Sequence, residues 1–67
     1  MIEVSSSAIR VVGYDPRSRT LKIEFTSNTK RIYIYFDVLD HHYHGLLSAS
    51  SKGEYFNRYI RDQYAVR

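Results

Sequence analysis

The chain has 67 residues, a formal net charge of +3 and no cysteine. This length predicts one domain, residues 1–67, and the absence of cysteine excludes disulfides and thiolate metal sites, so its stability must come from a packed core, with self-association as a further source. No run approaches the ~20 apolar residues of a membrane span. The N-terminus also lacks the pattern of a signal peptide, so we expect a cytoplasmic protein with no membrane partner.

Two strands joined by a turn are predicted in the first part of the chain. Residues 9–14 are rich in β-branched side chains, which favour strands. Asp15 and Pro16 suit the first two positions of a type I turn. Residues 20–26 then alternate between apolar and polar side chains, as is typical of a half-buried strand. Its apolar face carries Leu21, Ile23 and Phe25.

Residues 30–36 form a third predicted strand, and its orientation is ambiguous. One face carries Ile32, Ile34 and Phe36, and the other carries Arg31, Tyr33 and Tyr35. A two-residue turn before the strand would align the isoleucine face with the apolar face of the second strand. A turn longer by one residue would align the tyrosine face instead, because a one-residue slip exchanges the two faces. We favour the isoleucines inward on the hydrophobic pattern.

A first helix is predicted after these strands. Asp37 can cap it, and Asp40 lies in its first turn, where a carboxylate suits the helix dipole. Gly45 weakens its interior by about 1 kcal/mol relative to alanine. Its apolar stripe consists of Leu39, Tyr43, Leu46 and Leu47. Residues 48–51 separate this helix from the next.

A second helix is predicted from about residue 52 to residue 63. Ser51 and Glu54 have the spacing of a capping box, in which each side chain accepts a hydrogen bond from a backbone N–H. Arg58 is spaced for ion pairs with Glu54 and with Asp62. Its apolar stripe consists of Tyr55, Phe56, Tyr59 and Ile60.

Together the elements predict an α+β fold. Short connections make the three strands an antiparallel β-meander, which is followed by the two helices in the order βββαα. Helices packed on one face of the sheet would bury both apolar stripes and leave the other sheet face open.

The sequence offers no catalytic or metal-binding signature. His41, His42 and His44 cluster on the first helix, but a metal needs further ligands, for which only Asp37 or Asp40 is at hand. A solvated polar helix face is the better interpretation. There is no glycine-rich phosphate loop and no hydrolase motif. We therefore predict no enzyme, no catalytic residue, no metal and no cofactor.

Tyrosine and arginine provide the functional signal. Tyr33 and Tyr35 lie two apart on a strand, so their rings face the same way about 7 Å apart. On an exposed face, with Arg31 beside them, they would form a platform for the bases of a single-stranded nucleic acid. In the alternative the two rings are packing residues between strands. The pattern alone favours this alternative.

A second basic group lies on the second helix. Lys52 and the helix N-terminus could jointly receive a phosphate. In the alternative, ion pairs with acidic neighbours cancel much of the field of the helix. The complete set of candidate nucleic-acid-binding residues is Tyr33, Tyr35, Arg31, Lys52, Arg58 and Arg61.

Several motifs spread over nearly all of the chain resemble one known family. They are Val12-Gly13-Tyr14-Asp15, Leu21-x-Ile23-x-Phe25, Tyr33-x-Tyr35-Phe36-x-Val38, Leu46-Leu47-x-Ala49 and Ser51-Lys52-Gly53-x-Tyr55-Phe56-Asn57-x-x-Ile60-Arg61-x-x-Tyr64. With these motifs the sequence resembles a KTSC domain, the module named for the C-terminus of some lysyl-tRNA synthetases, which also occurs alone in bacterial and phage proteins. The resemblance implies a module of unknown activity, proposed to bind RNA because of the synthetase context.

The chain departs from the family pattern in two places. The family usually has a glycine in the turn before the central Tyr33-x-Tyr35 motif, whereas here residues 26–32 form a longer stretch without one. A proline commonly follows the valine after that motif, and here Leu39 follows Val38. Both departures concern the strand register and the start of the first helix.

We therefore predict a small non-catalytic binding module whose partner is RNA or another nucleic acid. The alternative is a protein–protein interaction module, such as a phage-borne protein that docks on host transcription or translation machinery. Tyrosine and arginine are enriched in protein interfaces as well, so composition does not separate the two. We expect a monomer or a weak homodimer.

Overall fold

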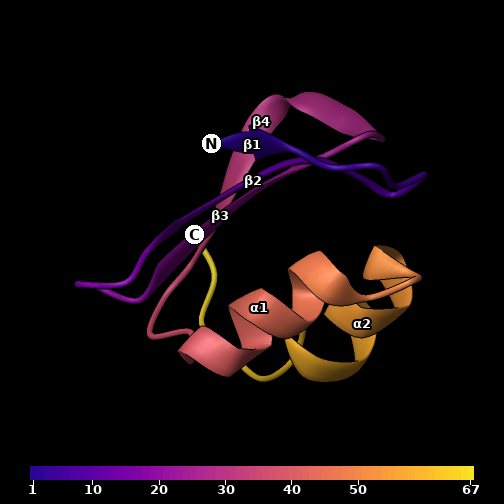
Figure 1. Cartoon of the computed structure of the whole chain (residues 1–67). Helices are drawn as coiled ribbons and strands as arrows, with labels where there is room; N and C mark the ends of the chain where they lie inside the picture. Colours follow the sequence, from indigo (N-terminus) through magenta and orange to yellow (C-terminus); the bar gives the residue numbers. More distant parts are fainter.

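The computed structural model describes residues 1–67 as a four-stranded antiparallel sheet with both helices on one face (Figure 1). The strands lie in the order β1-β2-β3-β4. The α+β class and the helices on one face are as predicted, but the prediction of three strands is wrong. The elements are β1 (Ile2–Glu3), β2 (Ile9–Asp15), β3 (Thr20–Phe25), β4 (Asn28–Tyr35), α1 (Asp40–Ser48) and α2 (Lys52–Tyr59).

The additional strand, β1, is too short for a sequence pattern to reveal. Its two residues pair with Val12 and Val11 of β2, and both are exposed. Neither side chain therefore adds to an alternation of buried and exposed positions, which is the signal by which a strand is predicted. β1 forms because the backbone edge of β2 offers it hydrogen-bonding partners.

The register of β4 reverses the predicted orientation of the third strand. A two-residue turn joins Phe25 to Asn28, which pair with each other, as the isoleucine-inward alternative required. However, two steps along β3, from Phe25 to Ile23, correspond to five steps along β4, from Asn28 to Tyr33. The irregularity therefore adds three residues to β4. Because three is odd, the tyrosines face the helices and the isoleucines do not.

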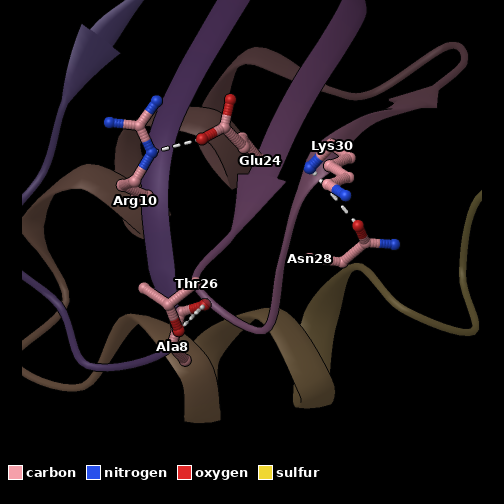
Figure 2. Close-up of polar contacts among 6 residues, drawn as sticks. All are labelled: Ala8, Arg10, Glu24, Thr26, Asn28 and Lys30. Atoms are coloured by element: carbon pink, nitrogen blue, oxygen red, sulfur yellow. Dashed lines mark hydrogen bonds and ion pairs between the residues drawn. The ribbon is translucent and has the colours of Figure 1, made fainter.

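Figure 2 shows polar contacts of β2, β3 and the bulged start of β4. The guanidinium of Arg10 forms an ion pair with Glu24, which is only 7 % exposed. The Thr26 N–H donates to Ala8 O at 3.0 Å, which closes the end of the β2–β3 pair. In β4 the Lys30 N–H donates to the side-chain oxygen of Asn28 at 3.3 Å. A side chain thus supplies an acceptor where the strand ladder is interrupted.

Helix α1 begins later than predicted, and Asp37 does not cap it. Asp37 has φ 60°, and Leu39 occupies the N-cap position without a side-chain cap. Short polar residues such as aspartate tolerate this left-handed conformation, and the turn buries Val38 completely. The helix start is held from elsewhere, because the Leu39 N–H donates to Tyr64 Oη at 3.3 Å. Asp40 lies in the first turn, as predicted.

Tyr14 also holds the start of α1 from the sheet. Its hydroxyl lies 2.6 Å from both Val38 O and Asp40 Oδ1. Burial, followed by the hydrogen bond to Asp40, raises the pKa of Tyr14 to about 12. The Tyr14 ring stacks on Tyr43 of α1, with centroids 4.5 Å apart. The side of α1 next to the sheet is therefore aromatic as well as aliphatic.

Helix α2 starts as predicted and ends four residues early. The Ser51 hydroxyl accepts a hydrogen bond from the Glu54 N–H, which is one half of the capping box. The helix closes where the N–H groups of Ile60 and Arg61 both donate to Phe56 O, at 3.0 and 2.9 Å. This closure turns the chain back toward β4.

The last residues of the chain return to the sheet along the free edge of β4. Ile34 and Arg67 exchange two backbone hydrogen bonds of 3.1 and 2.8 Å, and the Phe36 N–H donates to Ala65 O at 3.0 Å. These contacts cover part of an edge that would otherwise leave backbone groups unpaired.

The core lies between the sheet and the helices. Gly45 allows α1 and α2 to approach closely, because a Cβ at this position would overlap the hydroxyl and ring of Tyr55. Both helices fall short of the length and hydropathy that a bilayer crossing requires. The buried core residues are Ile9, Val12, Leu21, Ile23, Tyr35, Val38, Leu46, Phe56 and Ile60.

Candidate nucleic-acid interface

The predicted two-ring platform on β4 is absent, because the register turns both tyrosines toward the helices. Tyr35 is 5 % exposed and packs edge-to-face on Phe56, with centroids 5.5 Å apart. Tyr33 is half-buried and packs edge-to-face on Phe25 at 5.2 Å. The packing alternative is therefore the one that the structure shows for these rings. Tyr35 presents no free face on which a base could stack.

Two predicted arginines nevertheless lie near these tyrosines. The guanidinium carbon of Arg31 is 4.3 Å from the centre of the Tyr33 ring. Burial raises the pKa of the Tyr35 hydroxyl and the neighbouring Tyr33 adds to the rise, while the positive charges of Arg61 and Arg31 oppose it. Both arginines are thus close enough to act on the hydroxyl end of Tyr35. We call Arg31, Tyr33, Tyr35 and Arg61 the arginine–tyrosine edge.

Lys52 is engaged within the protein. Its ammonium donates to Ala49 O at 3.1 Å, and the residue is half-buried. The ammonium therefore serves the connection between the two helices. A polar cleft of about 400 Å³ lies beside it, between residues 5–8 and residues 50–53.

Arg58 is exposed in the last turn of α2 and has no acidic partner. The one ion pair of the structure joins Arg10 and Glu24, so the predicted pairs of Arg58 with Glu54 and Asp62 do not form. Arg61 is likewise exposed without an ion pair. The positive field of this helix face is therefore not cancelled by close contacts.

The aromatic surface that does face solvent lies on α2. Tyr59 is 40 % exposed, and its ring lies 4.6 Å from that of Tyr55 at an angle of 43°. His42 of α1 extends the group, with its ring centre 5.9 Å from that of Tyr59. We call Tyr55, Tyr59 and His42 the helix aromatic surface. Arg58 directly precedes Tyr59 in the chain and borders this surface.

Sequence reasoning placed Tyr55 and Tyr59 on the buried stripe and so missed the exposure of Tyr59, while Tyr55 is half-buried. Phe56 and Ile60 form the buried row of α2, whereas Tyr55 and Tyr59 form the adjacent row, about 100° away around the helix. A tyrosine at the border of a stripe packs its ring edge and keeps its polar end in water. The choice of tyrosine, rather than an aliphatic residue, at these two positions therefore indicated the border of the apolar stripe.

The histidines of α1 have different surroundings. His42 Nδ1 lies 2.5 Å from Tyr64 Oη, and burial, with a smaller effect of the neighbouring His41, lowers the pKa of His42. His41 and His44 are exposed. No three histidine, cysteine, aspartate or glutamate side chains gather closely enough to hold a metal ion. His42 is thus a polar packing residue between α1 and the C-terminal segment.

Known proteins resemble this chain over nearly its whole length. The model of the KTSC domain family matches residues 5–64. An uncharacterized protein of Stutzerimonas stutzeri is 35 % identical over 63 residues, which cover 94 % of this chain and 86 % of that protein. A lysine–tRNA ligase of a Nostoc species is 36 % identical over 64 residues, which cover 96 % of this chain but 11 % of the enzyme. The crystal structure of a KTSC domain protein from Yersinia pestis superposes with a TM-score of 0.89 and 36 % identity, covering 98 % of this chain and 90 % of that one.

Proposed function

The chain belongs to the KTSC domain family, and on that premise we propose that it is a non-catalytic module that binds single-stranded RNA. One observation carries the proposal. The ring of Tyr59 is exposed, braced by Tyr55 and bordered by the unpaired charge of Arg58. An exposed aromatic ring beside a free guanidinium is the combination by which proteins stack a base and hold its phosphate.

The positive charges support a path for the RNA backbone. Arg58 lies in the last turn of α2, and the exposed Arg61 follows three residues later, just beyond the helix. Arg31 lies 4.3 Å from the Tyr33 ring on β4, the strand to which the chain returns after Arg61. The path therefore runs from the helix aromatic surface along the exposed side of α2 to the arginine–tyrosine edge. Bases stack at its first end, and phosphates are neutralised along its length.

The relatives add an independent support. The enzyme named lysine–tRNA ligase acts on tRNA. A segment that makes up 11 % of its length matches 96 % of this chain. A module shared with an enzyme that acts on tRNA supports RNA as the partner. The same module in a separate chain would retain the RNA-binding surface without the chemistry of the ligase.

An NMR titration of the 15N-labelled protein with a mixed-sequence single-stranded RNA octamer tests the proposal. At low salt we expect shifts that concentrate on Arg58, Tyr59 and Arg61. At 200 mM salt the shifts should shrink, because binding to phosphate weakens as counterions compete. Tyr59→Ala should remove most of the effect, while the matched variant Tyr43→Phe, on the sheet side of α1, should keep it. If the RNA causes no shifts even at low salt, the protein is not a general RNA-binding module.

The open face of the sheet favours a second function, that of a protein-interaction module. Ile32 is 38 % exposed, and the half-buried Ile34 pairs with Lys22 on the side away from the helices. Exposed apolar side chains on a sheet face are typical of protein contacts. A partner bound there would shift Ile34 rather than Tyr59, and its affinity would respond much less to salt.

A further inference from the structure

A shallow hollow adjoins the helix aromatic surface. It has a volume of about 220 Å³ and is bounded on one side by the connection between the helices and on the other by α2. The lining residues are Ala49, Ser50, Ser51, Glu54, Tyr55, Arg58 and Tyr59.

The wall that α2 contributes consists of two parallel rows. Tyr55 and Tyr59 form one row, four residues apart, and Glu54 and Arg58 form the adjacent row with the same spacing. The first row offers aromatic rings 4.6 Å apart. The second row offers one carboxylate and one guanidinium. A planar ligand that contacts the rings would therefore direct its polar edge toward both charges.

The two charged side chains are free to receive such a ligand. Glu54 and Arg58 have the spacing of an ion pair but do not form one. Glu54 completes only the backbone half of the capping box, because its own carboxylate accepts no hydrogen bond. Carboxylate oxygens accept hydrogen bonds and cannot donate them when ionised. The hollow thus contains the two acceptor oxygens of Glu54 beside the N–H donors of Arg58, and neither group has a partner within the protein.

We propose that this hollow binds one unpaired guanine base of the RNA, which makes the module selective for strands that contain an accessible guanosine. The inference rests on the proposed RNA-binding function and adds a base preference to it. The base stacks on Tyr59 and Tyr55, the Glu54 carboxylate accepts from its Watson–Crick edge, and Arg58 binds the adjoining phosphate.

The chemistry of the four bases selects guanine. Guanine carries two neighbouring donors on its Watson–Crick edge, the ring N1–H and the N2 amino group, which match the two oxygens of one carboxylate. Adenine and cytosine place an acceptor nitrogen beside their amino group, and uracil flanks its single N–H with carbonyl oxygens. Each of these three would bring a lone pair against a carboxylate oxygen. A site built for paired donors discriminates strongly against bases that lack them.

An arginine side chain from a protein partner would also stack on tyrosine and pair with a carboxylate. The position of Arg58 argues against this ligand, because an incoming guanidinium would meet a like charge in the same hollow. In a nucleotide the phosphate and the base edge lie apart, so the phosphate can bind Arg58 while the donors of the base edge meet Glu54. The charge pattern therefore favours a nucleotide.

Fluorescence anisotropy with labelled RNA hexamers tests the inference. The probes are oligouridine and oligouridine with a single central guanosine, adenosine or cytidine. We expect the guanosine probe to bind about ten-fold more tightly than oligouridine, the size typical of one bidentate base contact. Glu54→Gln should abolish this preference, and any gain in affinity from the lost negative charge should be the same for all four probes. Asp62→Asn, which removes the same charge from an exposed position just beyond α2, should keep the preference.

The outcomes separate this inference from the proposed function. Salt-dependent binding of all four probes with equal affinity overturns the guanine site while RNA binding stands. Binding of none of the probes overturns both. Saturation of the hollow by an arginine tripeptide, with shifts at Tyr59 and no displacement by guanosine monophosphate, assigns the hollow to a protein ligand and overturns the guanine site. A guanosine preference that persists in Glu54→Gln overturns the role of the carboxylate.

Discussion

The chain has two pairs of tyrosines, one on β4 and one on α2, that look alike in the sequence and have different surroundings in the fold. Each pair lies beside an arginine, and each could be taken for a stacking surface. Tyr35 of β4 is 5 % exposed, whereas Tyr59 of α2 is 40 % exposed. Tyr33 and Tyr55 are both half-buried, so the contrast lies in Tyr35, which is part of the core, and Tyr59, which faces solvent.

The difference teaches that burial of a strand residue is decided at a distance. The two-residue turn before β4 would by itself point the isoleucines toward the helices. Three additional residues near the start of β4 exchange its two faces, so the tyrosines point there instead. On α2 the period of the helix fixes which residues share a row, and only the depth of each row depends on packing. Substitutions at the two sites should therefore have opposite effects on stability and on binding.

The largest expected effect is the loss of stability on replacing Tyr35. Tyr35→Ala should lower the free energy of unfolding by about 3–5 kcal/mol, because it leaves a cavity against Phe56. In a domain of this size that loss can abolish the folded state, so Tyr35→Phe serves as the second variant. It should stay folded, because the Tyr35 hydroxyl makes no hydrogen bond within the protein. Urea denaturation followed by circular dichroism measures both. A fully stable Tyr35→Ala would contradict the structural role of this ring.

Tyr59→Ala should show the reverse behaviour. We expect RNA binding to weaken by about 1–3 kcal/mol, the contribution of one stacked base. The free energy of unfolding should change by less than about 1 kcal/mol, as for an exposed side chain. Tyr59→Phe should bind normally, because the ring does the stacking. Anisotropy and urea denaturation on the same preparations give the two numbers. Equal losses of stability and binding would mean that the ring acts through packing.

The close approach of the two helices gives a third test. In an open helix, Gly45→Ala would stabilise by about 1 kcal/mol. Here the new methyl group would overlap the Tyr55 ring, and we expect a net destabilisation of about 1–3 kcal/mol, as for an overpacked core. NMR shifts should spread to Tyr59, which packs on Tyr55. Stabilisation by Gly45→Ala would show that α1 and α2 lie further apart than described.

The elements that could be predicted from the sequence are those set by local rules. The Ser51 cap, the buried positions of Phe56 and Ile60, and the alternation of Leu21 and Ile23 in β3 all follow from spacing within one element, and the structure confirms them. The motifs also identified the KTSC family, which the comparisons confirm.

The remaining features depend on contacts between distant segments. Asp37 had the right residue type for a helix cap, but the helix start is held by Tyr64 from the other end of the chain. Likewise Lys52 bonds to Ala49 O rather than remaining free, which depends on how the two helices meet. No spacing rule within one element contains such information.

The salt dependence of RNA binding compares Arg58 of the helix with Arg31 of the strand, with a smaller expected effect. Each phosphate contact on a single strand contributes about 0.7 to the slope of log K against log salt concentration. Arg58→Ala should reduce the slope by about that amount. Arg31→Ala should do the same if the RNA reaches the arginine–tyrosine edge, whereas Arg17→Ala, in the exposed β2–β3 turn, should leave the slope unchanged. An unchanged slope for Arg58→Ala would remove Arg58 from the binding surface.

The smallest expected effect is a pH dependence at the contact between α1 and the C-terminal segment. Tyr64 Oη accepts from the Leu39 N–H, and a neutral His42 can accept the Tyr64 hydroxyl proton at Nδ1. Protonation of Nδ1 removes this acceptor, which agrees with the lowered pKa of His42 in the folded state, caused first by burial. Above the ordinary value of 6.5 both states are neutral and pH has no effect through this group.

As pH falls below 6.5, the unfolded chain takes up the proton first, so stability should decrease until the folded state is protonated as well. The difference in unfolding free energy between pH 7.5 and pH 5.5 should shrink in His42→Gln relative to the unmodified protein. His44→Gln, an exposed histidine two residues further along the same helix, should retain the full difference. If both variants lose it equally, the effect comes from overall charge, because only His42 bonds to the segment that returns to β4.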